Sequence, residues 1–396
     1  MRKSFDLVDL KVIEALATFG PRNISGVSRK LCIPAETLRK RINRLHSQTF
    51  LRFHINVCHA NLGLITAVVF AETIPGYENA LRDALKINDF WMFVSTCYGM
   101  FEGCVGIFNI PNRSCSQFER FISEIERRGL TRRTQVFWST FFHPAPSLCK
   151  WFNQKTKSWN FDWERWIQEI KNGDTDSLYT LVTPKAFSIK ADETDVFLLK
   201  ELEKDARVSF ERLGKKLSIS PQLVGYHYYK HLLGRRLFES FRATVFHFGK
   251  DSEFFFFIFS FDGWEKLVRF ASSLLGKPFV KTLGKILGKN ELYGYLYFPR
   301  SEFRTFLEVL SKLVRSGFLK SYQYVIQDLT SSSRETIPFQ CFEKGRWSYN
   351  HERYIKILHK FLKEKPLVSK QPTPKIHTKI STVHISDTNN TLNRTS

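Results

Sequence analysis

Apolar residues recur at helical spacing near the start of the chain and again near its middle. In residues 6–45 the pattern predicts three helices, at 6–19, 25–31 and 35–46, separated by turns at Gly20-Pro21 and Ile33-Pro34. The last of these helices turns Leu38, Ile42 and Leu45 inward. A strand-like stretch at 51–57 follows. The pattern is typical of a helix-turn-helix with a wing.

Downstream of each helical head, strand-sized apolar runs alternate with amphipathic helices. The first set is predicted at 62–72 (strand), 77–85 (helix), 91–97 and 102–108 (strands), 115–128 (helix) and 133–141 (strand). The second is predicted at 254–261 (strand), 264–275 (helix), 278–282 and 291–298 (strands), 302–315 (helix) and 321–327 (strand). The order β-α-β-β-α-β predicts a ferredoxin-like body. The fold class is therefore α+β, with two winged helix-turn-helix domains each followed by such a body.

The sequence itself repeats. Residues 6–45 align with 192–232 at an offset of 186, which superposes Asp6 on Asp192 and Asp9 on Asp195. In the bodies the offset is 188, so that Pro111 aligns with Pro299. Two aspartate pairs in register within a matching apolar frame favour duplication of one unit.

The repeat gives a division of the chain. It runs 1–60 (first head), 61–145 (first body), 146–190 (Trp-rich connecting helix), 191–249 (second, divergent head), 250–330 (second body), 331–365 (basic C-terminal segment) and 366–396 (disordered tail). In the connecting segment Trp163, Trp166, Ile167 and Ile170 share one helical face, which predicts packing and not a flexible linker.

The charge balance points to polyanions. Lys and Arg number 60 against 38 Asp and Glu, a net charge of +22 over 396 residues. Residues 1–60 hold eleven cations against four acids, whereas residues 190–249 hold eleven against eight. Such a surface suits nucleic acid first and an anionic membrane second. We expect double-stranded DNA as the partner and no membrane association.

The seven cysteines are scattered and form no C-x-x-C pair, so neither a disulfide framework nor a zinc ribbon is indicated. The N-terminal residues have no apolar core of a signal peptide, and no run reaches the roughly 20 residues of a membrane helix. We expect a cytoplasmic protein.

The third helix of the first head carries the candidate DNA contacts. The residues facing away from its apolar stripe, with one cation of the wing, are Glu36, Thr37, Arg39, Lys40, Asn43, Arg44 and Arg52. Arginine pairs with guanine and asparagine with adenine, so Arg39 or Asn43 is expected to contact base edges. A generic three-helix domain with a solvated basic face is the alternative.

These residues also carry a family resemblance. D-x-x-D before an apolar helix, followed by L-x-I-P-x-x-T-L-x-x-R-I-x-R-L, resembles the N-terminal domain of the archaeal and bacterial Lrp/AsnC regulators. The matching residues are Asp6, Asp9, Leu31, Ile33, Thr37, Leu38, Arg41, Ile42 and Leu45. The likeness spans about 280 of the 396 residues, strongly only in the first head. It implies a tandemly duplicated transcriptional regulator that binds DNA in a sequence-specific way.

The second head fits this pattern more loosely. Its third helix carries Gln222, Tyr226 and Lys230 as candidate DNA contacts. It also contains Gly225, which costs about 1 kcal/mol of helix stability, and tyrosines in place of cations. Packing of these aromatic residues is the alternative to DNA contact.

The resemblance also implies an effector site, because members of the family often bind amino acids near a G-x-x-D turn in the body. The corresponding turns here contain Gly99 and Glu102 in the first body and Gly288 and Glu291 in the second. Glycine permits the positive φ that such a turn demands, which is also a purely structural explanation. We expect a small-molecule effector, such as an amino acid, at these turns.

No P-loop, nucleophile elbow or H-E-x-x-H motif is present, so we expect no enzyme, no catalytic residues, no cofactor and no metal. Cys58-His59 with His54 lacks a second cysteine nearby, which favours a packed or exposed pair. Two alternatives remain. One is a non-DNA-binding interaction protein. The other is an Lrp-like decarboxylase of a siroheme-type tetrapyrrole.

The decarboxylase alternative comes through the resemblance, which implies His and Arg lining the cavity of the body. The first body offers His143, Arg132 and Arg133 near one strand, and the second body has almost no His.

Covalent linkage of two bodies raises their effective concentration to the millimolar range. We therefore expect body 62–142 to pack on body 250–328 as an intramolecular pseudo-dimer, with the heads projecting from opposite sides. Further homo-oligomerisation through outer sheet edges stays open.

Overall fold

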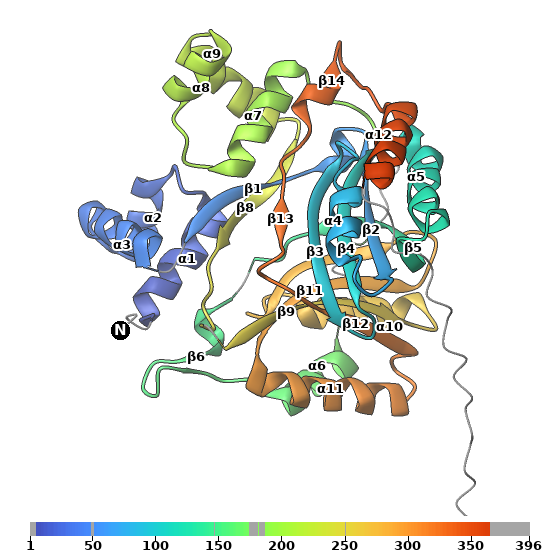
Figure 1. Cartoon of the computed structure of the whole chain (residues 1–396). Coiled ribbons are helices and arrows are strands. Elements are labelled where there is room, and N and C mark those ends of the chain that lie inside the picture. The colour runs from blue at the N-terminus through green and yellow to red at the C-terminus, as the bar shows by residue number, and fades with distance from the viewer. Residues whose placement is uncertain are drawn as a thin grey trace, which may run out of the picture.

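The computed structural model describes residues 5–48, 51–145, 147–173, 181, 187–249 and 251–364. The chain contains both helices and strands, as the sequence predicts, and Figure 1 shows two helical heads beside a large β-structure. The predicted disordered tail, 366–396, lies outside the described residues. None of the described helices has the length and apolar character that a membrane span requires.

The first head contains three helices and one strand: α1 (Leu7–Phe19), α2 (Ile24–Leu31), α3 (Ala35–Gln48) and β1 (Arg52–Val57). The second contains α7 (Glu193–Lys204), α8 (Phe210–Leu217), α9 (Pro221–Tyr226), a π-helical segment (His227–Leu233) and β8 (Phe238–Thr244). Asp6 and Asp192 are the N-caps of α1 and α7, each within a capping box. Capping boxes satisfy backbone N–H groups that a helix leaves unpaired, which explains why both helices begin there.

The bodies repeat one order of elements. The first has β2 (Leu64–Thr73), α4 (Glu78–Leu85), β3 (Trp91–Gly99), β4 (Gly103–Pro111), α5 (Cys115–Arg127) and β5 (Thr131–Phe142). The second has β9 (Ser252–Ser260), α10 (Trp264–Leu274), β10 (Val280–Ile286), β11 (Glu291–Pro299), α11 (Arg300–Arg315) and β12 (Ser321–Gln327). These bounds lie within a few residues of those predicted from hydrophobic spacing.

The two bodies join into one closed β-structure. The strands pair in the order β12-β9-β11-β10-β5-β2-β4-β3, and β3 also pairs with β12, so the described strands form a ring of eight. Strand β5 meets β10 through Leu283 opposite Phe142, and β3 meets β12 through Cys97 opposite Gln327. The bodies therefore pair within one polypeptide, as covalent linkage predicts.

The heads do not project from opposite sides, which corrects our expectation. Strand β1 pairs antiparallel with β8, with Phe53 opposite Ala243, and this two-stranded ribbon connects both heads on one side of the barrel (Figure 1). Helix α1 packs on β8 and α7 on β1. Each strand of the ribbon is thus covered by a helix, which a two-stranded ribbon needs because it buries too little apolar area to be stable by itself.

The connecting and C-terminal segments are structured around this frame. The connecting segment forms β6 (Phe152–Asn153), β7 (Ser158–Trp159) and α6 (Trp163–Asn172), and the four predicted stripe residues of α6 are buried against α10 and α11. The C-terminal segment, for which only a basic stretch was expected, forms β13 (Ser333–Arg334), β14 (Phe342–Glu343), β15 (Arg346–Trp347) and α12 (His351–Glu364). Strand β13 extends the sheet beside β3.

Replacing Trp166 by alanine is expected to destabilise the protein by about 3–5 kcal/mol, because a large buried side chain leaves a cavity. The Trp166 side chain is 1% exposed, stacks on Phe306 and donates its indole N–H to Ser273 at 3.0 Å. Urea unfolding measures the loss. Trp264, 45% exposed, is the matched control. Equal shifts for Trp166→Ala and Trp264→Ala would contradict the assigned packing.

Candidate functional site

The inside of the strand ring is aromatic. Residues on alternate positions of β9 and β11 face inward, so Phe254, Phe256, Tyr293, Tyr295 and Tyr297 gather in one buried cluster. The Tyr295 hydroxyl donates to Gln327 at 2.7 Å, whereas the buried Tyr293 hydroxyl has no hydrogen-bond partner. A buried unpartnered hydroxyl costs free energy, which a hydrogen bond to a bound ligand would recover.

Two histidines lie at one end of the ring, His143 after a ring strand and His59 between β1 and β2. His143 directly follows β5, and its Nδ1 lies 3.0 Å from the Thr282 hydroxyl. His59 follows β1, and its Nε2 lies 2.8 Å from Asn109 Nδ2. The Oδ1 of Asn109 accepts from Thr66, so its Nδ2 donates to His59, whose Nε2 must be unprotonated.

Burial keeps both imidazoles neutral. It lowers the pKa of His59 to about 4, and burial followed by the charge of Arg242 lowers the pKa of His143 to about 3. Both rings retain some exposed surface, so they are half-buried groups that a ligand can contact.

Three cations come to the same end from distant parts of the chain. Arg242 lies on β8, Lys281 in a bulge of β10, and Arg334 on β13 beside Phe93. Burial, then Arg334, lowers the pKa of Arg242 to about 10. Burial, then Arg242, lowers the pKa of Lys281 to about 7. Both shifts arise first from removal of the charged group from water and then from repulsion by a neighbouring like charge.

We call Arg242, Lys281, Arg334, His59 and His143 the cationic cluster. Among the described residues, no carboxylate oxygen lies within 4.0 Å of its two arginines or its lysine. Lys281 rests over the Tyr297 ring at 5.0 Å, and Arg334 over the Phe93 ring at 5.4 Å. Arg242 and Lys281 are partly removed from water, whereas Arg334 is exposed. Cations that lose hydration without gaining a counter-ion are costly, so the cluster is suited to bind an anion.

The residues expected to contact DNA lie elsewhere, on the heads. Those exposed in the structure are Glu36, Thr37, Arg39, Lys40, Asn43, Arg52, Gln222, Tyr226 and Lys230. Arg44 instead forms an ion pair with Asp9, and Arg22 inserts into the second head over the Phe210 ring. Arg44 is therefore less available to DNA than its position on the helix predicts. DNA contact by the others stays a prediction.

The expected effector residues also lie away from the cationic cluster. Gly99 and Glu102 belong to the turn between β3 and β4, and Gly288 and Glu291 border the turn between β10 and β11. Both glycines have positive φ, +118° and +73°, so the turns need glycine for conformational reasons alone. Effector binding there stays a prediction.

Of the cationic cluster, the sequence indicates His143 for the decarboxylase alternative and gives no local signal for the three cations. Arg132 and Arg133 were predicted to lie beside His143, but both are exposed near the start of β5. The extended strand places them about 33 Å from His143. Arg242, Lys281 and Arg334 lie on three strands far apart in sequence, and nothing local connects them. The alternating tyrosines 293, 295 and 297 were the one usable signal, since they predict a polar-tipped face.

No protein-family model matches the chain, and no curated protein matches its sequence. Among solved structures, the siroheme decarboxylase NirDL matches 90% of this chain and 99% of its own, with 13% identity and a TM-score of 0.48. B. subtilis LrpC (18% identity, TM-score 0.28) and E. coli AsnC (16%, 0.28) match 34% and 37% of this chain. These matches cover 93% of the LrpC chain and 98% of the AsnC chain.

These comparisons contradict one prediction. We expected the protein not to be an enzyme, but the NirDL structure, which matches 90% of this chain, is that of a decarboxylase. The regulators match about a third of the chain. A role as a regulator is not confirmed.

Replacing Lys281 by methionine is expected to stabilise the protein near neutral pH and to flatten its pH dependence. The unfolded chain keeps the Lys281 proton up to about pH 10.5, whereas the folded chain loses it near pH 7. The unfolded state binds more protons between these values, so wild-type stability rises with pH across this window. Urea unfolding at several pH values measures the difference. Lys40→Met, at an exposed site, is the control, and identical profiles for both variants would contradict an unpaired buried lysine.

Proposed function

We propose that this protein is a decarboxylase of a carboxylate-rich tetrapyrrole of the siroheme type. The observation that carries the proposal is the cationic cluster, three cations without a carboxylate partner at one end of an aromatic interior. A tetrapyrrole presents a flat aromatic ring and several carboxylates. Aromatic side chains suit the ring, and arginines suit the carboxylates through paired hydrogen bonds.

The proposed reaction consists of the loss of CO2 and the addition of a proton. The bond between a side-chain carbon and its carboxylate breaks, CO2 leaves, and a proton is added to the carbon that keeps the electron pair. No oxidant or reductant is required. Arg242 and Arg334 would hold the carboxylates that are retained. The reacting carboxylate would face the aromatic interior, where removal from water disfavours the charged ground state.

A proton donor for the carbon is also available. Lys281 has a pKa of about 7, and a general acid works best when its pKa is near the working pH. We assign the proton transfer to Lys281. His59 and His143, neutral at this pH, would act as hydrogen-bond partners for the substrate.

Titration with iron uroporphyrin III is expected to shift its main absorption band, with binding weakened by Arg242→Ala. One hydrogen bond to a charged group contributes about 1.5–3 kcal/mol, so Kd should rise roughly ten- to hundredfold. Arg132→Ala is the matched control, since Arg132 is an exposed arginine on a strand of the same barrel. Mass spectrometry of siroheme after incubation tests for loss of CO2. Equal binding by both variants, or no CO2 loss by the wild type, would refute the proposal.

We further propose that the bodies are ferredoxin-like and that the heads are winged helix-turn-helix domains, the first of which contacts double-stranded DNA. The observation that supports DNA contact concerns two exposed cations of the first head. The side chains of Arg39 and Lys40 on α3 are 58% and 78% exposed, and the nearest acid, Glu36, lies 3.9–4.0 Å from them. Ion pairs this long and exposed hold their partners weakly, so both cations are available to phosphates.

Neutralising Arg39 and Lys40 together is expected to flatten the salt dependence of DNA binding. Each lost phosphate contact reduces the slope of log affinity against log salt by roughly 0.9. Gel shifts at several salt concentrations measure the slope. Lys215 and Arg304, exposed cations in acid pairs elsewhere, are suitable control positions. An unchanged slope would show that α3 makes no phosphate contact.

A further inference from the structure

The two heads share a carboxylate pair but neutralise it differently. In each head the N-cap aspartate and the aspartate three residues later form a capping box, so each carboxylate uses one oxygen on a backbone N–H. The bonded oxygens are Oδ1 of Asp6 and Asp192 and Oδ2 of Asp9 and Asp195. The other oxygen of each carboxylate is left to face the third helix.

In the first head, arginines occupy that position. Arg41 Nη1 lies 2.8 Å from Asp6 Oδ2 and 2.8 Å from Asp9 Oδ1, and Arg44 also pairs with Asp9. The negative charge of the buried Asp9 is thus balanced by two permanent cations. A guanidinium is always protonated, so these two positive charges do not change with pH.

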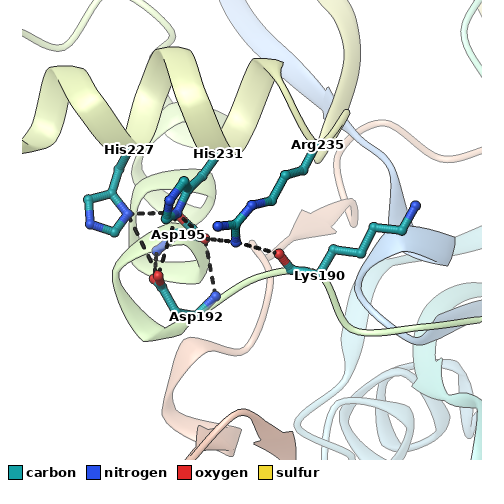
Figure 2. A network of polar contacts seen from close by, with 6 residues as sticks. All are labelled: Lys190, Asp192, Asp195, His227, His231 and Arg235. Carbon is teal, nitrogen blue, oxygen red and sulfur yellow. Dashed lines mark hydrogen bonds and ion pairs between the residues drawn. The ribbon is translucent and has the colours of Figure 1, made fainter.

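In the second head, histidines stand in the same place. The repeat offset of 186 aligns Arg41 with His227, and the π-helical segment adds the residue that brings His231 into position one turn later. Figure 2 shows both imidazoles directed at the carboxylates of Asp192 and Asp195. π-Helical turns are rare and occur frequently at functional sites.

Four donor atoms converge here, all within 4.8 Å of one another. His227 Nδ1 lies 2.8 Å from Asp195 Oδ1 and 3.8 Å from Asp192 Oδ2. The corresponding distances for His231 Nδ1 are 3.0 and 3.5 Å. Ligands of a tetrahedral zinc ion, at 2.0–2.2 Å from the metal, lie about 3.4 Å apart. The observed spacing therefore fits one small ion without large rearrangement.

The surroundings favour occupation by a cation. The Asp195 side chain is 0% exposed, and each histidine side chain is 12% exposed. The one cation near this carboxylate among the described residues is Arg235, whose Nη1 is 3.7 Å from Asp195 Oδ2 and is bonded to the Lys190 carbonyl. Two adjacent carboxylates thus face a single guanidinium here, where the first head provides two. The Asp192 side chain, 44% exposed, gives an ion access from solvent.

We propose that Asp192, Asp195, His227 and His231 bind one divalent transition-metal ion of the zinc class. Each imidazole would coordinate through Nδ1 and carry its proton on Nε2, and each carboxylate would coordinate through the oxygen not used in the capping box. The backbone N–H groups of that box orient the carboxylates as outer-shell partners. The ion replaces the guanidinium of the first head and ties the π-helical segment to α7.

Cobalt(II) titration of the full chain, stripped with chelator, tests the proposal. Tetrahedral Co²⁺ gives strong visible absorption, and the expected stoichiometry after dialysis is one ion per chain. His227→Arg restores the first-head residue and should abolish binding while keeping a cation beside the aspartates. His359→Gln is the matched control, because His359 pairs with Glu124 at 2.7 Å outside the cluster.

Asp192→Asn provides a second variant in case His227→Arg does not fold, since asparagine remains a good N-cap while losing the ligand charge. It should weaken Co²⁺ binding at least tenfold. Zinc should raise the thermal unfolding midpoint of the wild type and of His359→Gln, but not of either cluster variant. Absence of bound Co²⁺ in the wild type, or equal binding by the cluster variants, would overturn the proposal.

Discussion

Hydrogen bonding between the two bodies of one chain is the constraint on which the remaining structure depends. Strand β5 pairs with β10 and β3 with β12, so the strands of both bodies become one closed ring. Closure removes the unpaired strand edges through which two separate sheets would otherwise associate with other chains. It also creates an interior that neither body has alone, and this interior is filled largely by Phe and Tyr side chains from both copies.

The same closure explains how a charged site arises at one end of an aromatic interior. Pairing of β1 with β8 joins the heads and brings Arg242 toward the bodies, while a bulge in β10 adds Lys281 and β13 adds Arg334. Burial lowers the pKa of Arg242 and of Lys281, and a neighbouring arginine adds to each shift, Arg334 for Arg242 and Arg242 for Lys281. A fold retains such groups at a cost in stability, and binding of an anionic substrate is the function that accounts for them.

The two heads balance the same pair of aspartates in different ways. In the first head, Arg41 and Arg44 balance the aspartate pair permanently, and exposed cations remain on α3. In the second, imidazoles replace the guanidiniums, and a π-helical segment shifts the helix by one residue. The capping box is unchanged, because both helices still need their first backbone N–H groups satisfied. The heads therefore share the aspartate capping box, and they differ in the side chains of the third helix that contact its carboxylates.

The sequence by itself determined the repeat, the helices, the order of strands in each body and the caps at Asp6 and Asp192, because hydrophobic spacing and capping act over a few residues. It also indicated His143 as a candidate, although with Arg132 and Arg133 as partners. Only the tertiary structure decided which residues share a site. Arg242, Lys281 and Arg334 come to one end of the ring because their strands pair with strands that lie more than a hundred residues away in the sequence. His231 reaches Asp195 because of the π-helical segment. Local patterns cannot encode such contacts, since strand register and helix distortion are set by packing of the whole chain.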